Sequence, residues 1–159
     1  MPGSWEIPGP DTLVVTLTRE LVTMRWAASL RALNLPQNSD IRFLAGMPYD
    51  HARNVGCEEA LNRGFQWLFF LDDDVVMPPD GIHILKASNL PLVSGLYYRR
   101  HEPVTPVAIT LTPQGPQWIT GYEKGKLFPA DYVGAGCLLI HRSVLEKMPS
   151  PWFEWWSDQ

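Results

Sequence analysis

The feature that most constrains the fold is an apolar run, residues 67–71, which ends abruptly on Asp72, Asp73 and Asp74. The run is short, rich in large side chains and without period-two alternation, which is typical of a strand buried on both faces. Such strands belong to α/β sheets that carry helices on both sides. Ligands of open α/β sheets bind beyond the carboxyl ends of the strands, and the aspartates lie at that end.

The three adjacent carboxylates predict a metal–diphosphate site. Neighbouring like charges cost free energy unless water, hydrogen-bond donors or a cation neutralises them. A divalent cation held by one or two carboxylates and by a ligand's phosphates is a common solution. The alternative is a solvated turn or a helix N-cap before Pro78 and Pro79, because Asp favours both positions. Both interpretations remain open on these residues alone.

The rest of the chain alternates between strand and helix patterns. Apolar runs predict strands at residues 12–18, 41–45, 67–71 and 92–98. Helical spacing predicts helices at residues 19–33, from a cap at Asp50 to Gly64, and at 80–87. This β-α alternation predicts an α/β fold with a mostly parallel sheet and right-handed crossovers.

The pattern changes in the C-terminal half of the chain. Residues 107–111 and 117–120 are short β segments flanked by Pro and Gly, which indicates a small antiparallel excursion. Residues 132–141 then read as one returning strand, and residues 143–147 as a short helix capped by Ser143.

Length, charge and cysteine content narrow the class of protein. The 159 residues predict one domain, 1–159, and the net charge of −4 argues against nucleic acid as a partner. No span of about 20 apolar residues and no signal peptide is recognisable, so we expect a cytoplasmic protein without a transmembrane segment, although a lipid-linked substrate is compatible with this. Cys57 and Cys137 lack CxxC spacing and are expected to be buried, reduced thiols.

Three segments together resemble the GT-A nucleotide-sugar glycosyltransferases, particularly their family-two-like, DxD-containing members. The segments are Ala52-Arg53-Asn54 opening a helix, Phe70-Leu71-Asp72-Asp73-Asp74-Val75-Val76-Met77-Pro78, and Val133-Gly134-Ala135-Gly136-Cys137-Leu138-Leu139-Ile140-His141-Arg142 followed by Pro151-Trp152-Phe153. Any one of them alone is a weak signal, whereas the three in this order and spacing are fairly specific. The resemblance spans about residues 12–153 and implies a GT-A-like, Rossmann-like sheet.

The resemblance implies roles for the aspartates. Asp72 would face the nucleotide ribose or the metal shell, and Asp74 would coordinate Mn²⁺ or Mg²⁺ bridging the donor diphosphate. A fixed cation would stabilise the negative charge that develops on the leaving nucleoside diphosphate. Asp73 is counted among the nucleotide-sugar-binding residues, although it is expected to point the other way and to be solvated or hydrogen-bonded.

Donor contacts are also expected from two helix starts. Thr18 and Arg19, at the end of the first strand, would lie under the nucleotide base, and an exposed helix start is the competing interpretation. Arg53 and Asn54 would supply donors to the nucleotide or diphosphate from a first helical turn. For Arg53 the alternative is a structural salt bridge to Asp50 or to an acidic loop residue.

Small and basic residues complete the predicted binding set. Gly134, Ala135 and Gly136 would let the backbone approach the sugar closely, and a tight strand entry without a ligand is the alternative. The step from Arg99 to His101 could contact phosphate or acceptor, or could simply be solvated.

The sequence departs from the family at its C-terminal end. Relatives usually continue past the Pro-Trp-Phe segment to an acidic motif that supplies the catalytic base, and then to a metal-binding His. Here Glu154 and Asp158 are the only carboxylates after Phe153, so they are the candidate bases. The chain is therefore expected to lack the usual catalytic-base segment, and Trp155 and Trp156 to be exposed or buried against another copy.

The overall prediction is a metal-dependent glycosyltransferase that transfers a sugar from a nucleoside diphosphate donor, a UDP- or GDP-sugar, to a hydroxyl acceptor. The resemblance favours inversion of stereochemistry. One alternative is a non-catalytic nucleotide-sugar-binding fragment, which the missing tail favours. Another is a nucleotidyltransferase, although Thr18-Arg19-Glu20-Leu21 is not the Gly-rich phosphate loop that such enzymes normally use. A homo-oligomer is compatible with the sequence.

Overall fold

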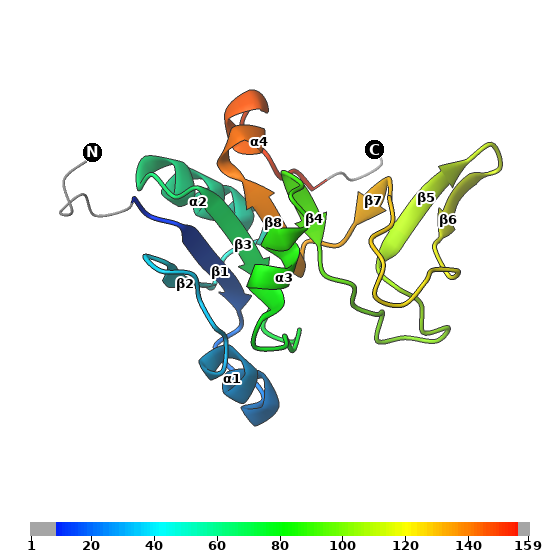
Figure 1. Ribbon diagram of the computed structural model, residues 1–159, viewed down its shortest axis with the longest axis horizontal. Helices are drawn as coiled ribbons and strands as arrows, with labels where there is room; N and C mark the ends of the chain where they lie inside the picture. Colours follow the sequence, from blue (N-terminus) through cyan, green and yellow to red (C-terminus); the bar gives the residue numbers. More distant parts are fainter. Residues whose placement is uncertain (1–8, 156–159) are drawn as a thin grey trace.

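A five-stranded sheet forms the centre of the protein (Figure 1). The computed structural model describes residues 9–155. The strands of this sheet lie in the order β2 (Asp40–Ala45), β1 (Thr12–Thr18), β3 (Trp67–Leu71), β8 (Cys137–His141) and β4 (Leu92–Ser94). β1 pairs in parallel with β2 and β3, whereas β8 is antiparallel to both β3 and β4. The predicted α/β class with a mostly parallel sheet is confirmed.

Helices cover both faces of this sheet and divide the core in two. They are α1 (Met24–Arg31), α2 (Tyr49–Asn62), α3 (Gly81–Ala87) and α4 (Arg142–Lys147). On one face Leu68 and Phe70 pack with residues of α2 and α4, and on the other Phe69 and Leu71 pack with α3. Adjacent β3 residues therefore enter different cores, which explains why the run carries no polar alternation. Within residues 9–155, no helix is long and apolar enough to cross a membrane.

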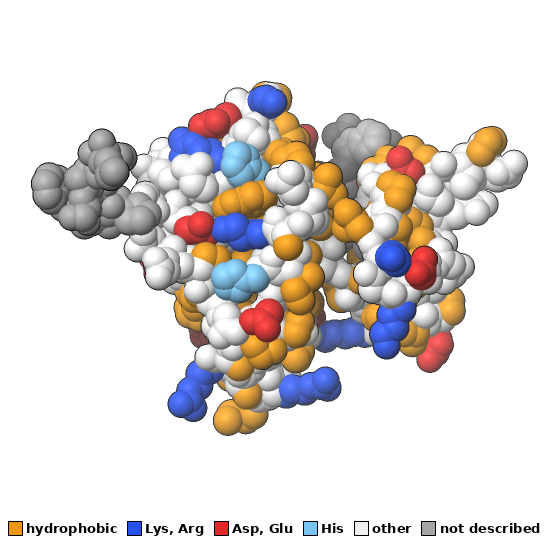
Figure 2. All heavy atoms as spheres, in the orientation of Figure 1, with side chains coloured by type: hydrophobic (Ala, Val, Ile, Leu, Met, Phe, Trp, Pro, Cys, Tyr) orange, Lys and Arg blue, Asp and Glu red, His pale blue; other side chains and the backbone are white. Residues whose placement is uncertain are grey.

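A small antiparallel sheet lies beyond β4, at the right of Figure 1. It consists of β6 (Gly115–Trp118), β5 (Ala108–Thr112) and β7 (Tyr132–Val133), in that order. The expected antiparallel excursion is thus present. A groove of about 1220 Å³ separates it from α3 and β4, and Figure 2 shows hydrophobic side chains on both sides of the hollow.

The expected single strand over residues 132–141 is wrong, because the chain breaks at residues 134–136 and changes sheets. β7 belongs to the small sheet and β8 to the central sheet. A Cβ at Gly134 would lie 1.9 Å from Tyr97 Oη, so only glycine lets the chain pass this ring. Gly134 therefore packs against a side chain that is distant along the chain.

Three element boundaries also differ from expectation. The first helix begins at Met24 rather than at residue 19, because Glu20 has φ 75° and the Thr23 hydroxyl caps the helix by accepting from Trp26 N at 3.2 Å. The N-cap of α2 is Pro48, with Asp50 inside the first turn. β4 ends at Ser94 rather than at residue 98.

Candidate functional site

The carboxyl ends of β1, β2 and β3 lie at one edge of the sheet, since these strands are parallel. Asp72, Asp73 and Asp74, called here the aspartate loop, follow β3 at that edge. Asp72 N donates to Gly136 O at 2.9 Å, and Trp26 Nε1 donates to Asp72 O at 3.0 Å. The backbone of the loop is thus held from both sides, by the segment before β8 and by α1.

Asp72 is paired with the guanidinium of Arg53. Arg53 Nη2 lies 3.0 Å from Asp72 Oδ1, and the two side chains are only 12% and 28% exposed. Burial raises the pKa of Asp72, the Arg53 charge opposes this rise, and the neighbouring Asp74 and Asp73 charges add to it. Asp72 is therefore a carboxylate whose negative charge is incompletely compensated within the protein.

Arg53 reaches Asp72 from the fifth residue of α2, so it lies one turn further into the helix than the expected first turn. Its guanidinium carbon lies 5.7 Å from the Phe70 ring centroid and 5.9 Å from that of Phe153, so aromatic rings hold it in place. Arg53 Nε is buried without a hydrogen-bond partner among residues 9–155. Of the two salt bridges considered for Arg53, the structure shows the one to an acidic loop residue rather than to Asp50.

The other two aspartates have different partners. Arg19 N donates to Asp73 Oδ2 at 3.3 Å, so Asp73 is hydrogen-bonded to the end of β1. Asp74 Oδ2 accepts from the Arg100 guanidinium, and both of these side chains are exposed. The structure thus places the aspartate loop, Arg53 and the end of β1 close together, and each carboxylate points to its own partner. The cleft at the end of β1 is lined by neither Arg53 nor an aspartate of the loop.

Tyr97 packs against residues 134–136, which are called here the glycine segment. Gly136 N donates to Tyr97 Oη at 3.1 Å, and burial raises the pKa of this phenol. A Cβ at Gly136 would lie 2.8 Å from Asp72 Oδ2 and 3.0 Å from Tyr97 Oη. The glycine segment therefore packs closely against Tyr97 and Asp72, which agrees with the alternative of a tight strand entry, and its approach to a sugar stays a prediction.

A cleft of about 440 Å³ adjoins the site at the ends of β1 and β2. Its lining includes Thr18, Arg19 and Tyr49, and the Arg19 guanidinium carbon lies 6.0 Å from the Tyr49 ring centroid. Thr18 Oγ1 accepts from Glu20 N at 3.0 Å, which shapes the turn that leaves β1. The cleft has the position expected for a nucleotide base, beside the first turn of α2.

Three other predicted site residues are Asn54, Ala135 and Glu154. Asn54 binds the backbone of Phe153 with both ends of its amide, donating to O at 2.7 Å and accepting from N at 3.0 Å. Asn54 thus anchors the segment that contains Phe153 to α2. Ala135 packs against the α2 side of the core, and Glu154 is exposed. Asp158 lies outside the described residues, as does Trp156, whereas Trp155 is 77% exposed.

Sequence reasoning missed Trp26 and Tyr97 as parts of the site. Tyr97 follows the carboxyl end of β4, so the rule that located the aspartates could have located it. Trp26 reaches Asp72 O from α1, and nothing in its own neighbourhood along the chain signals that contact.

The carboxylates of the aspartate loop are the candidate ligands of the expected divalent cation. Among residues 9–155, no three His, Cys, Asp or Glu side chains form a cluster that could hold a metal ion. Mg²⁺ sites are commonly built from only one or two carboxylates together with substrate phosphates. Asp72 and Asp74 are carboxylates of the kind that such a site uses. On their own they would hold a divalent cation weakly, and a ligand's phosphates would complete the site.

Comparisons with known proteins establish the fold and nothing further. No protein-family model and no curated protein matches the chain. Seven chains of solved structures match it. One is described as the crystal structure of A197 from STIV, with a TM-score of 0.60, 20% sequence identity, and coverage of 88% of this chain and 69% of that chain. At this identity the likeness shows a shared fold only.

Proposed function

We propose that this chain is a GT-A-like, metal-dependent glycosyltransferase, which binds a nucleoside diphosphate sugar and transfers the sugar to a hydroxyl acceptor. The observation that supports it best is the meeting of three chain segments at one sheet edge: the β1 end, Arg53 of α2 and the aspartate loop. Together they offer a cleft for a base, a guanidinium and carboxylates, which are the groups a nucleotide, a diphosphate and a divalent cation need.

Different residues of the site would bind different parts of the donor and the metal. Thr18 and Arg19 line the cleft proposed for the base, and Asp72 and Asp74 are the proposed metal ligands. A bound Mn²⁺ or Mg²⁺ would neutralise charge on the departing diphosphate. Arg53 holds Asp72 in one position from α2, which orients this carboxylate toward the glycine segment.

The catalytic base is the least supported part of the proposal. Glu154 is exposed and follows Phe153, whose backbone Asn54 clamps to α2 beside Arg53. Asp158 stays a candidate from sequence alone. A nucleotide-sugar-binding protein without transfer activity is the second candidate. Such a protein would bind the donor and transfer sugar very slowly, because the absence of a general base typically costs about 10²–10⁴-fold in rate. Nucleotidyl transfer is less well supported, because no Gly-rich loop follows β1.

The test is a calorimetric titration with UDP and with GDP, each with and without Mn²⁺. We expect Mn²⁺-dependent binding by the wild type and its near loss in Asp74→Asn, because a ligand charge is removed while the fold is kept. Asp80→Asn is the matched control, since the side chain of Asp80 is exposed and, among the described residues, accepts a hydrogen bond from Asn34 alone.

Unchanged Mn²⁺-dependent affinity in Asp74→Asn would contradict the metal-ligand role. A donor-hydrolysis and acceptor assay on the wild type then separates an enzyme from a binding protein. Turnover that is lost in Asp158→Asn or Glu154→Gln would identify the base.

A further inference from the structure

The two ends of the loop of residues 99–105 lie close together beside the site, and backbone hydrogen bonds join them. Arg99 N donates to Thr105 O at 2.9 Å, and Val107 N donates to Tyr97 O at 2.9 Å. A β-bridge between Tyr98 and Pro106 joins the same two ends. Tyr97 itself contacts the glycine segment, so the loop stands directly beside the aspartate loop. The backbone at the start of this loop is therefore fixed close to the site.

Two consecutive arginines of this loop have different partners. The Arg99 guanidinium carbon lies 4.8 Å from the Trp118 ring centroid, which fastens this side chain to the small sheet. Arg100 Nη2 instead donates to Asp74 Oδ2 of the aspartate loop. Arg100 is thus the residue of the pair that contacts the aspartate loop, and Arg99 offers a control with the same charge one position away.

The ion pair of Arg100 is easier to exchange than the ion pair of Arg53. The Arg100 and Asp74 side chains are 69% and 42% exposed, against 12% and 28% for Arg53 and Asp72. Exposed pairs contribute little to stability, because water and salt screen them. Asp74 can therefore change partner at little cost, whereas Asp72 is held.

The competing partner for Asp74 is the cation of the proposed function, on which this inference rests. A divalent cation on Asp74 and the Arg100 guanidinium would compete for the same carboxylate and repel each other. A diphosphate brings new negative charge to the same place, and a guanidinium binds phosphate oxygens with paired, charge-assisted hydrogen bonds. Arg100 would then leave the Asp74 carboxylate and bind the diphosphate.

We propose that Arg100 is a positioning residue that exchanges partners: it neutralises Asp74 while the site is empty and binds the donor diphosphate once a divalent cation occupies Asp74. The exchange predicts effects of opposite sign for one substitution. Removing the guanidinium should raise the affinity for the bare cation, because a competitor for Asp74 is lost. It should lower the affinity for the nucleotide, because a contact with the diphosphate is lost. A residue that only supported the loop would not shift the two affinities in opposite directions.

The experiment compares Arg100→Gln, Arg100→Lys and Arg99→Gln by titration, first with Mn²⁺ alone and then with UDP or GDP at saturating Mn²⁺. For Arg100→Gln we expect Mn²⁺ affinity to rise by up to about fivefold, and nucleotide affinity to fall roughly tenfold or more. Arg100→Lys keeps the charge without the planar fork, so its Mn²⁺ affinity should stay near wild type while its nucleotide affinity falls. Arg99→Gln should leave both affinities within about twofold, because solvent and salt screen a charge that lies on Trp118 rather than on the aspartate loop.

The outcomes separate this inference from the proposed function. If Asp74→Asn loses Mn²⁺-dependent binding but Arg100→Gln matches wild type, the exchange is wrong and the metal role survives. Equal losses of Mn²⁺ and nucleotide affinity in Arg100→Gln would also overturn it. If Asp74→Asn binds as wild type does, both the proposed function and the exchange fall together.

Discussion

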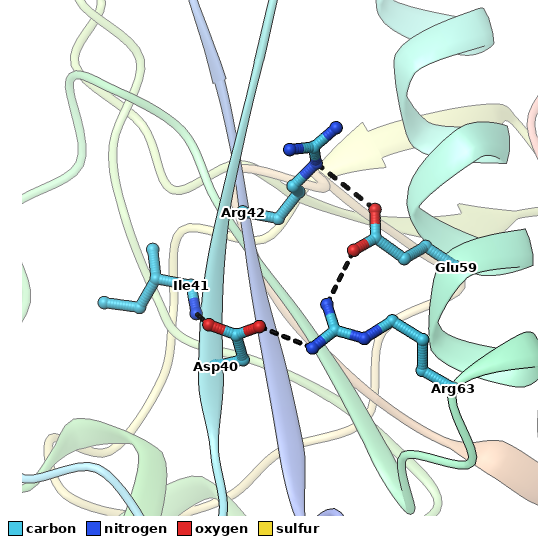
Figure 3. Close-up of polar contacts among 5 residues, drawn as sticks. All are labelled: Asp40, Ile41, Arg42, Glu59 and Arg63. Carbon is cyan, nitrogen blue, oxygen red and sulfur yellow. Dashed lines mark hydrogen bonds and ion pairs between the residues drawn. The ribbon is translucent and has the colours of Figure 1, made fainter.

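Two regions of the molecule use carboxylates and arginines in opposite ways. Figure 3 shows the first, called here the surface network, in which Arg63 binds Asp40 at 2.6 Å and Glu59 at 2.7 Å. Glu59 also pairs with Arg42 at 3.3 Å. Two carboxylates thus face two guanidiniums, on β2 and α2, and the charges balance within the network.

The second region is the aspartate loop, where the charges do not balance. Its three carboxylates face two guanidiniums and one backbone amide. The pKa of Asp40 is lowered, chiefly by its hydrogen bond to Arg63, whereas burial raises the pKa of Asp72 despite Arg53. The same residue types therefore stabilise a surface in one place and hold excess negative charge in the other.

The difference teaches what distinguishes a candidate site from an ordinary salt-bridge network. A surface network is satisfied as it stands, so it needs no ligand. Carboxylates that are partly buried and only partly compensated have a perturbed pKa, which is a common property of functional sites. Four stability predictions test this contrast between the two regions.

The largest expected effect is that of Arg53→Ala. It leaves Asp72 partly buried without its guanidinium and removes the contacts with two rings, so unfolding should become easier by roughly 3 kcal/mol. Arg53→Lys should lose less, because it keeps a charge near Asp72. Urea denaturation of both variants measures the difference. A loss for Arg53→Ala no greater than that of Arg63→Ala would remove the contrast between the regions.

A smaller loss is expected from Gly136→Ala. The added methyl would lie 2.8 Å from Asp72 Oδ2, so Asp72 or Tyr97 must move, at a cost of roughly 1–2 kcal/mol. Gly121→Ala is the control, since a Cβ there meets no atom within 4 Å among the described residues. Thermal unfolding of the pair tests this, and equal melting temperatures would show that the approach of the glycine segment is not tight.

In the surface network, Arg63→Ala should cost only about 0.2–1 kcal/mol, and less in high salt. The measurement is urea denaturation of wild type and variant at low and high salt. A loss that is large and independent of salt would mean that this network is not an exposed one.

The pH dependence should have opposite signs in the two regions. Because the Asp40 pKa lies below its ordinary 3.8, its ionised form stabilises the fold above that pH, and this contribution is lost as pH falls through the lowered pKa. Because the Asp72 pKa is raised, the folded state holds its proton more tightly, so stability contributed by Asp72 falls as pH rises through the raised pKa. Stability curves of Asp40→Asn and Asp72→Asn against wild type would show slopes of opposite sign. Slopes of the same sign would contradict the assignment.

Much of the central sheet was predictable because its signals are local. The buried strands β1 and β3, the helices α2 and α3 and the position of the aspartate loop follow from apolar runs, helical spacing and turn residues. The meeting of Arg53 with the aspartates followed from the rule that parallel strands place their carboxyl ends together. The glycosyltransferase prediction itself stays a prediction.

Two of the errors involve contacts with residues far away along the chain. The break between β7 and β8 lies where Gly134 and Gly136 pack against the ring of Tyr97. Asn54 was expected at a nucleotide, and its amide binds the backbone of Phe153 instead. No pattern within a window of neighbouring residues contains these contacts.

By itself the sequence determined the α/β class, the buried strands and the place where carboxylates emerge, because hydrophobic periodicity and turn chemistry act over a few residues. Only the tertiary structure decided how the charge there is shared. Asp72 meets Arg53, Asp73 meets the end of β1, and Asp74 meets Arg100. Such pairings depend on distances between segments and on burial, and these arise only when the chain is packed.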